Sequence, residues 1–196
     1  MRKLMFFTHT TLDGFVAGPN GEMDWIRFDE VRHEFVGMVT AQADTALYGR
    51  VTYQMMESYW PTAAAQANAT KHDIEHANWY NSISKIVLSR TLTEPGLTNT
   101  KVISNHLSEN IKKIKDQPGK NILIYGSPRA TQSLLNEQLV DEFWLWVNPV
   151  VLGQGVPLFN NLAGIIKLKL LETKTFDGGL IALHYAVVPD QNLIER

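Results

Sequence analysis

The chain of 196 residues contains no cysteine, which excludes disulfides and thiolate chemistry but leaves the compartment open. Long apolar runs are also missing: after Arg2-Lys3 only Leu4 to Phe7 is continuously apolar, too short for a signal-peptide core or a membrane span. Basic residues form no block, and a net charge of -2 argues against nucleic acid or an anionic membrane as the main partner. We expect one cytoplasmic domain over residues 1–196.

The strongest structural signal that is present lies near the C-terminal third of the chain. Phe143 to Val147 is an unbroken apolar run rich in aromatic residues, which is typical of a strand covered on both faces. Pro149 cannot donate to a strand ladder, and Gly153 and Gly155 permit a sharp turn. This segment therefore predicts a central strand followed by a tight loop.

Strand-like and helix-like segments alternate along most of the chain. Strands are predicted at about 3–11, 45–48, 85–89, 102–104, 121–125, 143–147, 167–175 and 180–188. Helices are predicted at about 29–42, from 50 onward, at 71–83, around 107–114 and at 128–138. The pattern predicts an α/β fold with a mixed, mostly parallel sheet that ends in an antiparallel hairpin. The loop at 13–25 is long enough to be functional.

Three of the predicted strands are followed by residues that favour anions. Gly49-Arg50-Val51-Thr52-Tyr53 offers a close backbone approach, a guanidinium and a hydroxyl at a helix start. Leu88-Ser89-Arg90 again places a hydroxyl beside a guanidinium, and Gly126-Ser127-Pro128 combines a glycine turn with the start of a helix. Because ligands bind at the carboxyl ends of parallel strands, we expect the three segments to share one site.

A ligand with separated phosphate groups suits such a site. Each segment alone is more often an ordinary turn or helix cap, but three at successive strand ends are harder to explain in that way. Two arginines indicate a phosphate monoester beside a diphosphate, and NADPH carries both. The sequence has no G-x-G-x-x-G after its first strand, which disfavours a Rossmann dinucleotide site.

The chain resembles the reductase domain found at the C-terminus of bacterial riboflavin-biosynthesis enzymes, a branch of the dihydrofolate reductase-like fold. The string from Leu139 to Phe159, with Leu-Val-Asp-Glu, an apolar strand and Pro-Val-Val-Leu-Gly-Gln-Gly-Val-Pro-Leu-Phe, is characteristic of that family. Gly49 to Tyr53, Leu88-Ser89-Arg90 and Gly126-Ser127 are similar to its NADPH-binding motifs. Thr11 to Ala17 is similar to its loop against the nicotinamide and the substrate.

This resemblance implies a three-layer α/β/α fold and NADPH-dependent hydride transfer to a small heterocycle of the pterin or pyrimidine type. It also implies a homodimer. The chain departs from the riboflavin-pathway members in two ways: Tyr125-Gly126-Ser127 stands where they carry Glu-Gly-Gly, and the ligand set of their zinc deaminase domain is missing from this sequence. It is therefore similar to the stand-alone members, and the substrate stays open.

Several side chains are candidates for the substrate side of such a site. Asp13 and Asp24 lie in the long loop and are the catalytic candidates, as proton relays or substrate anchors; turn formation is an equally good interpretation. An aromatic pocket for a flat heterocycle is predicted from the following residues, although core packing is the commoner role of such aromatics: Trp25, Tyr53, Trp60 and Tyr125.

His72 and His76 have the i, i+4 spacing of a helical metal site, but they lack the HExxH order and an obvious third ligand. We therefore predict a solvated helix face and no metal. Two functions from other classes stay open beside the reductase. A non-catalytic nucleotide-binding protein would bind NADPH without turnover, and an interaction module would not bind it at all.

Overall fold

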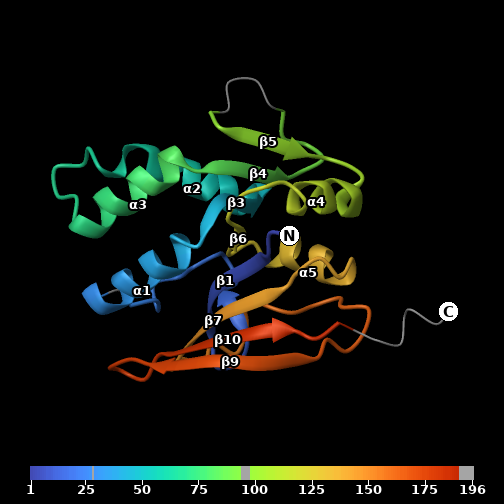
Figure 1. Cartoon of the computed structure of the whole chain (residues 1–196). Helices are drawn as coiled ribbons and strands as arrows, with labels where there is room; N and C mark the ends of the chain where they lie inside the picture. The colour runs from blue at the N-terminus through green and yellow to red at the C-terminus, as the bar shows by residue number, and fades with distance from the viewer. Residues whose placement is uncertain (28, 94–97, 190–196) are drawn as a thin grey trace.

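A twisted eight-stranded sheet forms the centre of the computed structural model, which describes residues 1–27, 29–93 and 98–189 (Figure 1). Its strand order is β5-β4-β3-β6-β1-β7-β10-β9. The strands are β1 (Leu4–Thr11), β3 (Ala43–Gly49), β4 (Ser84–Leu88), β5 (Thr100–Ile103), β6 (Asn121–Tyr125), β7 (Glu142–Asn148), β9 (Leu168–Thr175) and β10 (Ile181–Val187). The pairs from β5 to β7 are parallel, and β10 and β9 are antiparallel.

This arrangement confirms the predicted mixed sheet and its C-terminal hairpin. The apolar strand β7 lies between β1 and β10, and Phe143, Trp144 and Trp146 are buried. A strand inside a sheet that is covered on both faces needs apolar side chains in both directions, which explains the unbroken run. In the part of the chain that the structure describes, no helix is long and apolar enough to cross a membrane.

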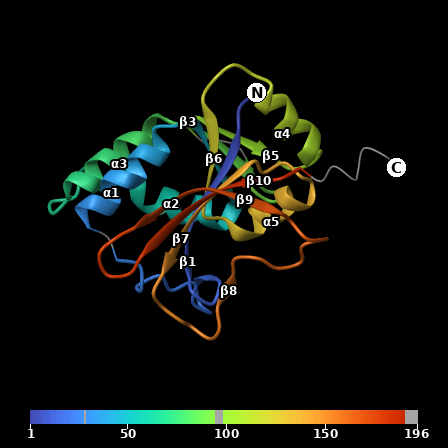
Figure 2. The same ribbon diagram turned by 60° about the horizontal axis from the view of Figure 1, so that its bottom comes forward.

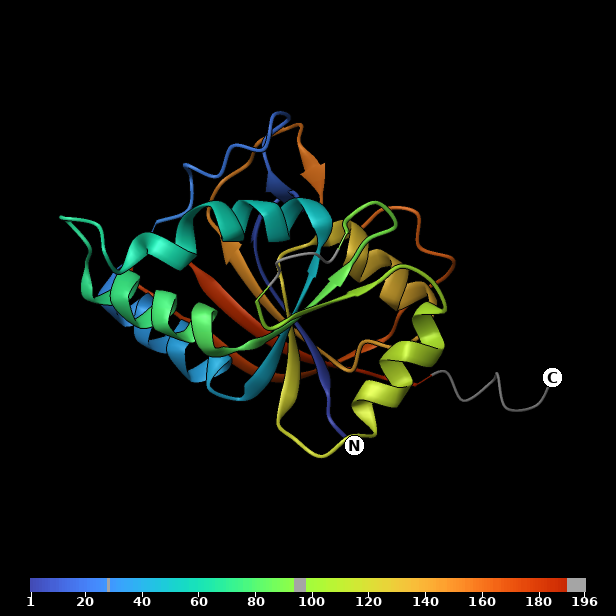
Figure 3. The ribbon, with the colours of Figure 1, turned by 90° about the horizontal axis from the view of Figure 1, so that it is seen from above.

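In the described part of the chain, five helices cover the two faces of the sheet (Figure 3). They are α1 (Glu30–Thr40), α2 (Arg50–Ala63), α3 (Lys71–Ser82), α4 (Leu107–Lys115) and α5 (Pro128–Asn136). Alternate residues of β1 show the two cores: Leu4 and Phe6 belong to the cluster that includes α4 and α5, whereas Met5 and Phe7 pack with α1. The resulting order of helices, sheet and helices is the predicted three-layer α/β/α architecture.

A second sheet of two short strands was not predicted. β2 (Phe15–Ala17) pairs with β8 (Val156–Pro157) beyond the ends of β1 and β7, where β8 is drawn in orange in Figure 2. Strands of three and two residues are too short to show an alternating pattern, and Pro157 is unfavourable inside a strand. The sheet therefore appears in the sequence only as turn-rich loops.

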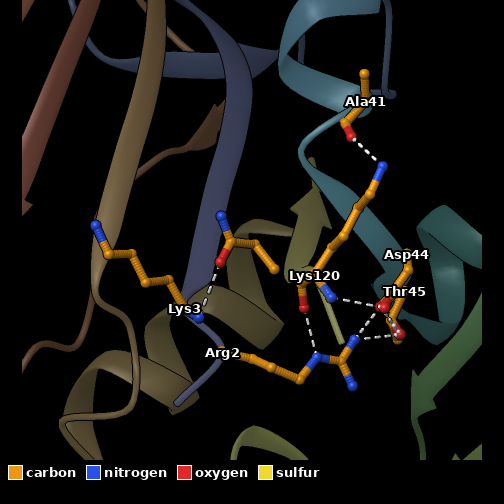
Figure 4. A network of polar contacts seen from close by, with 7 residues as sticks. Arg2, Lys3, Ala41, Asp44, Thr45 and Lys120 are labelled. Atoms are coloured by element: carbon orange, nitrogen blue, oxygen red, sulfur yellow. Dashed lines mark hydrogen bonds and ion pairs between the residues drawn. The ribbon is translucent and has the colours of Figure 1, made fainter. Parts of the chain in front are cut away.

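The amino ends of the strands are fixed by a polar network around Arg2 (Figure 4). The Arg2 guanidinium donates to the Lys120 carbonyl at 2.5 Å and to the Thr45 hydroxyl at 2.6 Å, and it forms an ion pair with Asp44. Asp44 also accepts from the Lys120 backbone N–H at 2.8 Å. These contacts join β1, β3 and the loop before β6 at the end of the sheet opposite the carboxyl ends.

Candidate functional site

A cavity of about 710 Å³ lies at the carboxyl ends of the parallel strands. All the residues predicted to bind the cofactor line it, and they come from the ends of β3, β4 and β6: Gly49, Arg50, Thr52, Leu88, Ser89, Arg90, Gly126 and Ser127. The parallel register explains their meeting, because Gly49 pairs with Leu88 across β3 and β4. The three sequence segments therefore share one site, as their positions after the strands predicted.

Three helices begin at the wall of this cavity, and none of them is capped by a side chain. The N-caps of α2, α4 and α5 make no side-chain cap hydrogen bond. By contrast, Asp29 caps α1, and Thr70 with Asp73 forms a capping box on α3. An uncapped first turn leaves its backbone N–H groups and the positive end of the helix dipole available to a ligand. Three such ends at one cavity are well suited to bind phosphate groups.

The turn between β6 and α5 shows why its serine does not cap the helix. Gly126 and Ser127 both have a left-handed backbone, with φ of 58° and 59°. The Ser127 hydroxyl accepts from the Gly49 N–H at 3.0 Å and donates to the Tyr125 carbonyl at 3.2 Å. Ser127 thus links the ends of β3 and β6 through hydrogen bonds. The backbone N–H groups at the N-terminus of α5 are left without a side-chain cap at the cavity.

The charged side chains at the cavity are all cationic. Arg50, Arg90 and Arg129 line it, and no carboxylate is found among its described lining residues. Arg50 is exposed, and its guanidinium contacts the Gln54 side chain at 3.0 Å. Arg129 and Asn105 were missed by the sequence analysis. Arg129 directly follows Ser127-Pro128 in the first turn of α5, so its position beside the glycine turn was an available signal.

The segments around the small sheet contribute mainly apolar side chains to the cavity wall. Val16 and Ala17 of β2, Val156 of β8 and Met23 line it, together with Thr8 near the end of β1. Leu158 donates its N–H to the Gly14 carbonyl at 2.8 Å, which holds the two loops of the small sheet together. The cavity therefore combines a cationic region suited to phosphates with an apolar region suited to a flat ring.

Comparison with known proteins agrees with this geometry. The family model of the RibD C-terminal domain matches residues 2–182. The chain belongs to the RibD C-terminal domain family. It is also 36% identical to the Bacillus subtilis (strain 168) protein YyaP over 187 residues, which is 94% of this chain and 94% of YyaP.

Solved structures show the same fold as this RibD C-terminal domain. A Shewanella sp. PV-4 protein assigned to riboflavin biosynthesis superposes with a TM-score of 0.75 at 25% identity, covering 95% of this chain and 99% of that protein. Dihydrofolate reductase from Enterococcus faecalis, solved with NADP(H), superposes with a TM-score of 0.62 at 13% identity, covering 95% of this chain and 97% of the reductase. The dihydrofolate reductase-like fold predicted from the sequence is confirmed.

The two carboxylates predicted to act in catalysis lie outside the described lining of the cavity. Asp13 accepts hydrogen bonds from the backbone N–H groups of Leu152, at 3.1 Å, and Gly153, at 2.7 Å. The Thr11 hydroxyl also donates to it at 2.6 Å, and this contact, followed by the Gly153 N–H, lowers the pKa of Asp13. In the RibD C-terminal domain Asp13 thus holds the loop after β7, and Asp24 is exposed.

Asp13→Ala should weaken NADPH binding about tenfold, because the loop after β7 loses its acceptor, whereas Asp13→Asn keeps one acceptor oxygen and should lose less than about threefold. Isothermal titration of both variants measures the difference. A general acid at this position would instead make Asp13→Asn as inactive as Asp13→Ala, with turnover reduced by about 100-fold or more. Equal loss of turnover in the two variants, with binding intact, would contradict the positioning role.

The aromatic side chains predicted for the substrate pocket lie outside the described lining of the cavity. Tyr53 is 2% exposed and packs in the core beside Tyr48, whose ring centroid is 6.3 Å away. The helical period explains the position of Tyr53, because Thr52 lines the cavity and the adjacent side chain points in another direction. Trp60 packs on His76. Trp25 and Trp60 are both partly buried, and both lie outside the described cavity lining.

Tyr125 is partly buried and packs against the core. Its ring lies 5.1 Å from Phe7 and 5.7 Å from His76, and burial raises the pKa of its hydroxyl well above the usual range. Strand alternation explains its direction, since Ile124 packs with the opposite layer. The residue that replaces the family's glutamate therefore contributes an aromatic ring to the packing beneath α1 and α3.

The prediction of a solvated face at His72 and His76 is wrong for His76. This side chain is 6% exposed, and it packs between Trp60 and Trp79. His72 stacks on His33 of α1 at 3.8 Å. Sequence reasoning failed here because histidines were counted as polar, although a neutral imidazole packs readily among aromatic rings. Among the described residues, no group of three or more candidate ligands could hold a metal ion.

Gly155→Ala should open the apolar region of the cavity. A Cβ at this position would lie 2.2 Å from the Ala17 carbonyl oxygen, so β8 and β2 must separate. We expect about tenfold weaker NADPH binding and a loss of about 2 kcal/mol in the free energy of unfolding. Gly164→Ala is the matched control, because a Cβ there meets nothing within 4 Å. Equal behaviour of the two variants would show that the close approach of β2 and β8 is unimportant.

Proposed function

We propose that this RibD C-terminal domain is an NADPH-dependent reductase that transfers a hydride to a small heterocyclic substrate of the pterin or pyrimidine type. The observation that carries the proposal is the cavity itself: Arg50, Arg90 and Arg129 line it, three uncapped helix N-termini open onto it, and no carboxylate occurs among its described lining residues. Such a surface favours a ligand with several negative charges, as the phosphates of NADPH provide. Family membership supports the same cofactor.

The residues present fit NADPH in two parts. The N-termini of α2 and α5, with Thr52 between them, are suited to the diphosphate, and Arg50 with Arg90 is suited to the 2′-phosphate. Thr8, Val16 and Ala17 line the mainly apolar region, which is suited to the nicotinamide ring. The bound cofactor would supply the hydride, while the chain's residues bind, orient and shield the reacting groups.

The protein's own contribution in this proposal is positioning. The small sheet of β2 and β8 contributes apolar side chains to the cavity wall, which would limit the access of water to the region where a hydride is transferred. Asp13 acts on this wall through Leu152 and Gly153 of the loop between β7 and β8. Orientation of two bound partners is a large source of rate enhancement even where no side chain transfers a proton.

Turnover tests this function directly. The purified chain is incubated with NADPH and, in separate reactions, with dihydropterins and with oxidised aminopyrimidines, and the absorbance of the reduced nicotinamide is followed. Enzyme-dependent loss of that absorbance with one class, slower in Gly155→Ala at equal protein concentration and subsaturating NADPH, supports the reductase. NADPH binding without turnover on either class would contradict it.

A non-catalytic NADP(H)-binding protein is the second candidate. One observation favours it: the carboxylates that could relay a proton, Asp13 and Asp24, lie outside the described cavity lining. This candidate predicts intact NADPH binding, no hydride transfer with either substrate class, and no change in the redox state of bound NADPH over hours.

A further inference from the structure

A second cavity, of about 560 Å³, lies at the amino ends of β3, β4 and β5. The first residues of these strands line it, together with Ile114 from the last turn of α4. It is therefore at the opposite edge of the sheet from the first cavity, and the two cavities share no described lining residue. The reductase proposal gives this second cavity no role, so its side chains need an explanation of their own.

Arg2 lies in the wall of the second cavity, although its side chain is only 8% exposed. Its Nε donates to the Lys120 carbonyl, and its Nη2 contacts Thr45 and Asp44. In the described part of the chain no acceptor contacts Nη1, and Figure 4 shows one terminal nitrogen of the guanidinium without a contact. A buried N–H donor without an acceptor is costly, so a ligand oxygen in the cavity would stabilise it.

The carboxylate in the cavity wall is already occupied by donors of the protein. Oδ1 of Asp44 contacts Arg2 and accepts from the Thr45 hydroxyl at 2.9 Å. Oδ2 accepts from the Lys120 backbone N–H at 2.8 Å. The negative charge of Asp44 is thus offset by the Arg2 guanidinium, which leaves the lysines of the wall to set the sign of the field in the cavity.

Strand register places two further donors on one face of the sheet. Ser84 pairs with Thr45 across β3 and β4, and Lys101 pairs with Ile86 across β4 and β5. Paired residues of neighbouring strands point to the same face, and Ile86 belongs to the core cluster that includes Ile114 of α4. Ser84 precedes Ile86 by two residues, so its hydroxyl is on that face as well. Ser84 and Lys101 are exposed and line the cavity.

Lys85 adds a positive charge from the other face of β4. It is 5% exposed, and its ammonium lies over the Tyr80 ring at 4.5 Å. Its partner on β3, Ala46, packs in the cluster that contains Tyr80, whereas Leu47 packs in the cluster beneath α4. The ammonium therefore points away from the second cavity. Its charge still adds to that of Lys101, so the field in the cavity favours an anion.

We propose that the second cavity binds a small phosphate monoester, whose oxygens accept from Arg2 Nη1, the Ser84 hydroxyl and the Lys101 ammonium. A phosphate monoester has three terminal oxygens that point in different directions, so it can meet donors from the start of the chain, from β4 and from β5. A carboxylate has two oxygens in one plane and would leave one donor without a partner. Ile86 and Ile114 also line the cavity and are suited to contact the organic part of the ligand.

The two cavities can be occupied at the same time. Thr45 and Gly49 belong to the same strand, and four residues of β3 span about 13 Å. A phosphate group in the second cavity therefore leaves the first cavity accessible. The second site is thus separate from the site proposed for NADPH.

Nuclear magnetic resonance of the ¹⁵N-labelled full chain tests this site, because it distinguishes the two cavities by residue. We expect the amide signals of Ser84 and Lys101 to shift with glycerol 3-phosphate and to saturate with a dissociation constant of about 1 mM. Inorganic phosphate should bind at least about threefold more weakly, because it lacks the organic part that contacts the apolar side chains. Equal affinities for the two probes would contradict an ester site. Shifts confined to Gly49 and Arg50 would place phosphate in the first cavity only and would overturn the proposal.

Two lysine variants complete the test. Lys101→Gln should raise the dissociation constant at least about fivefold, since it removes a charged donor. Lys112→Gln removes an exposed lysine of α4 outside the described lining of the second cavity and should change the constant less than about twofold. Both lysines are exposed, so unchanged thermal unfolding separates a binding defect from a folding defect. Equal effects of the two variants, or no saturable shift near the second cavity up to about 50 mM of either probe, would overturn the proposal. The reductase proposal does not depend on these results.

Discussion

Arg50→Ala should weaken NADPH binding about 30-fold, equivalent to about 2 kcal/mol, while NADH binding changes less than about threefold. The reason is that Arg50 stands at the N-terminus of α2, exposed and lining the cavity, where a guanidinium can pair with a phosphate monoester that only NADPH carries. Isothermal titration with each cofactor measures the two losses separately.

A matched arginine variant controls for the change in net charge. Arg27→Ala removes an exposed guanidinium that lies outside the described cavity lining, and both affinities should stay within about twofold. If Arg50→Ala weakens NADPH and NADH equally, Arg50 contacts a group that both cofactors share. That result would contradict the assignment of Arg50 to the 2′-phosphate.

The free energy of unfolding should fall by about 3 kcal/mol between pH 6.5 and pH 5, because two histidines are buried in the neutral form. Burial, followed by the nearby Arg32 charge, lowers the pKa of His9 to about 3, and burial lowers the pKa of His76 to about 3. The unfolded chain binds protons near pH 6.5 and the folded chain does not, so the stability is complete well above pH 6.5 and is lost as the pH falls through 6.5 toward 3. Each histidine contributes about half of the loss by pH 5.

Urea unfolding at the two pH values tests this expectation. His76→Asn should remove about half of the pH dependence, since one of the two buried imidazoles is gone. His106→Asn is the control: His106 is exposed, and the pH dependence should match the wild type. A wild-type stability that is flat over this range would mean that the buried histidines take up protons without unfolding.

The sheet was predictable because its strands follow strong rules. Phe143 to Val147 had to be covered on both faces, and the structure places β7 between β1 and β10. Gly49, Leu88 and Gly126 could be grouped into one cavity because parallel strands end at the same edge. Short sequence patterns indicate where the strands lie and in which direction they run, and these two features determine which strand ends meet.

Side-chain direction was harder to predict than strand position. Thr52 and Tyr53 are adjacent, yet one lines the cavity and the other is buried, and the correct phase of α2 is set by its packing on β3. The role of Asp13 could not be predicted, because the backbone N–H groups that donate to its carboxylate belong to Leu152 and Gly153, which lie far away in the sequence. A local pattern holds no information on such contacts, which form only when two loops meet.

The central claim is that the cavity binds NADPH through its phosphates. Titration of the purified chain with NADPH and with NADH, followed by quenching of its five tryptophans, tests it most directly. The account predicts a dissociation constant of about 1–10 µM for NADPH and at least tenfold weaker binding of NADH, roughly 1.4 kcal/mol. Binding of neither cofactor, or equal binding of both, would contradict it.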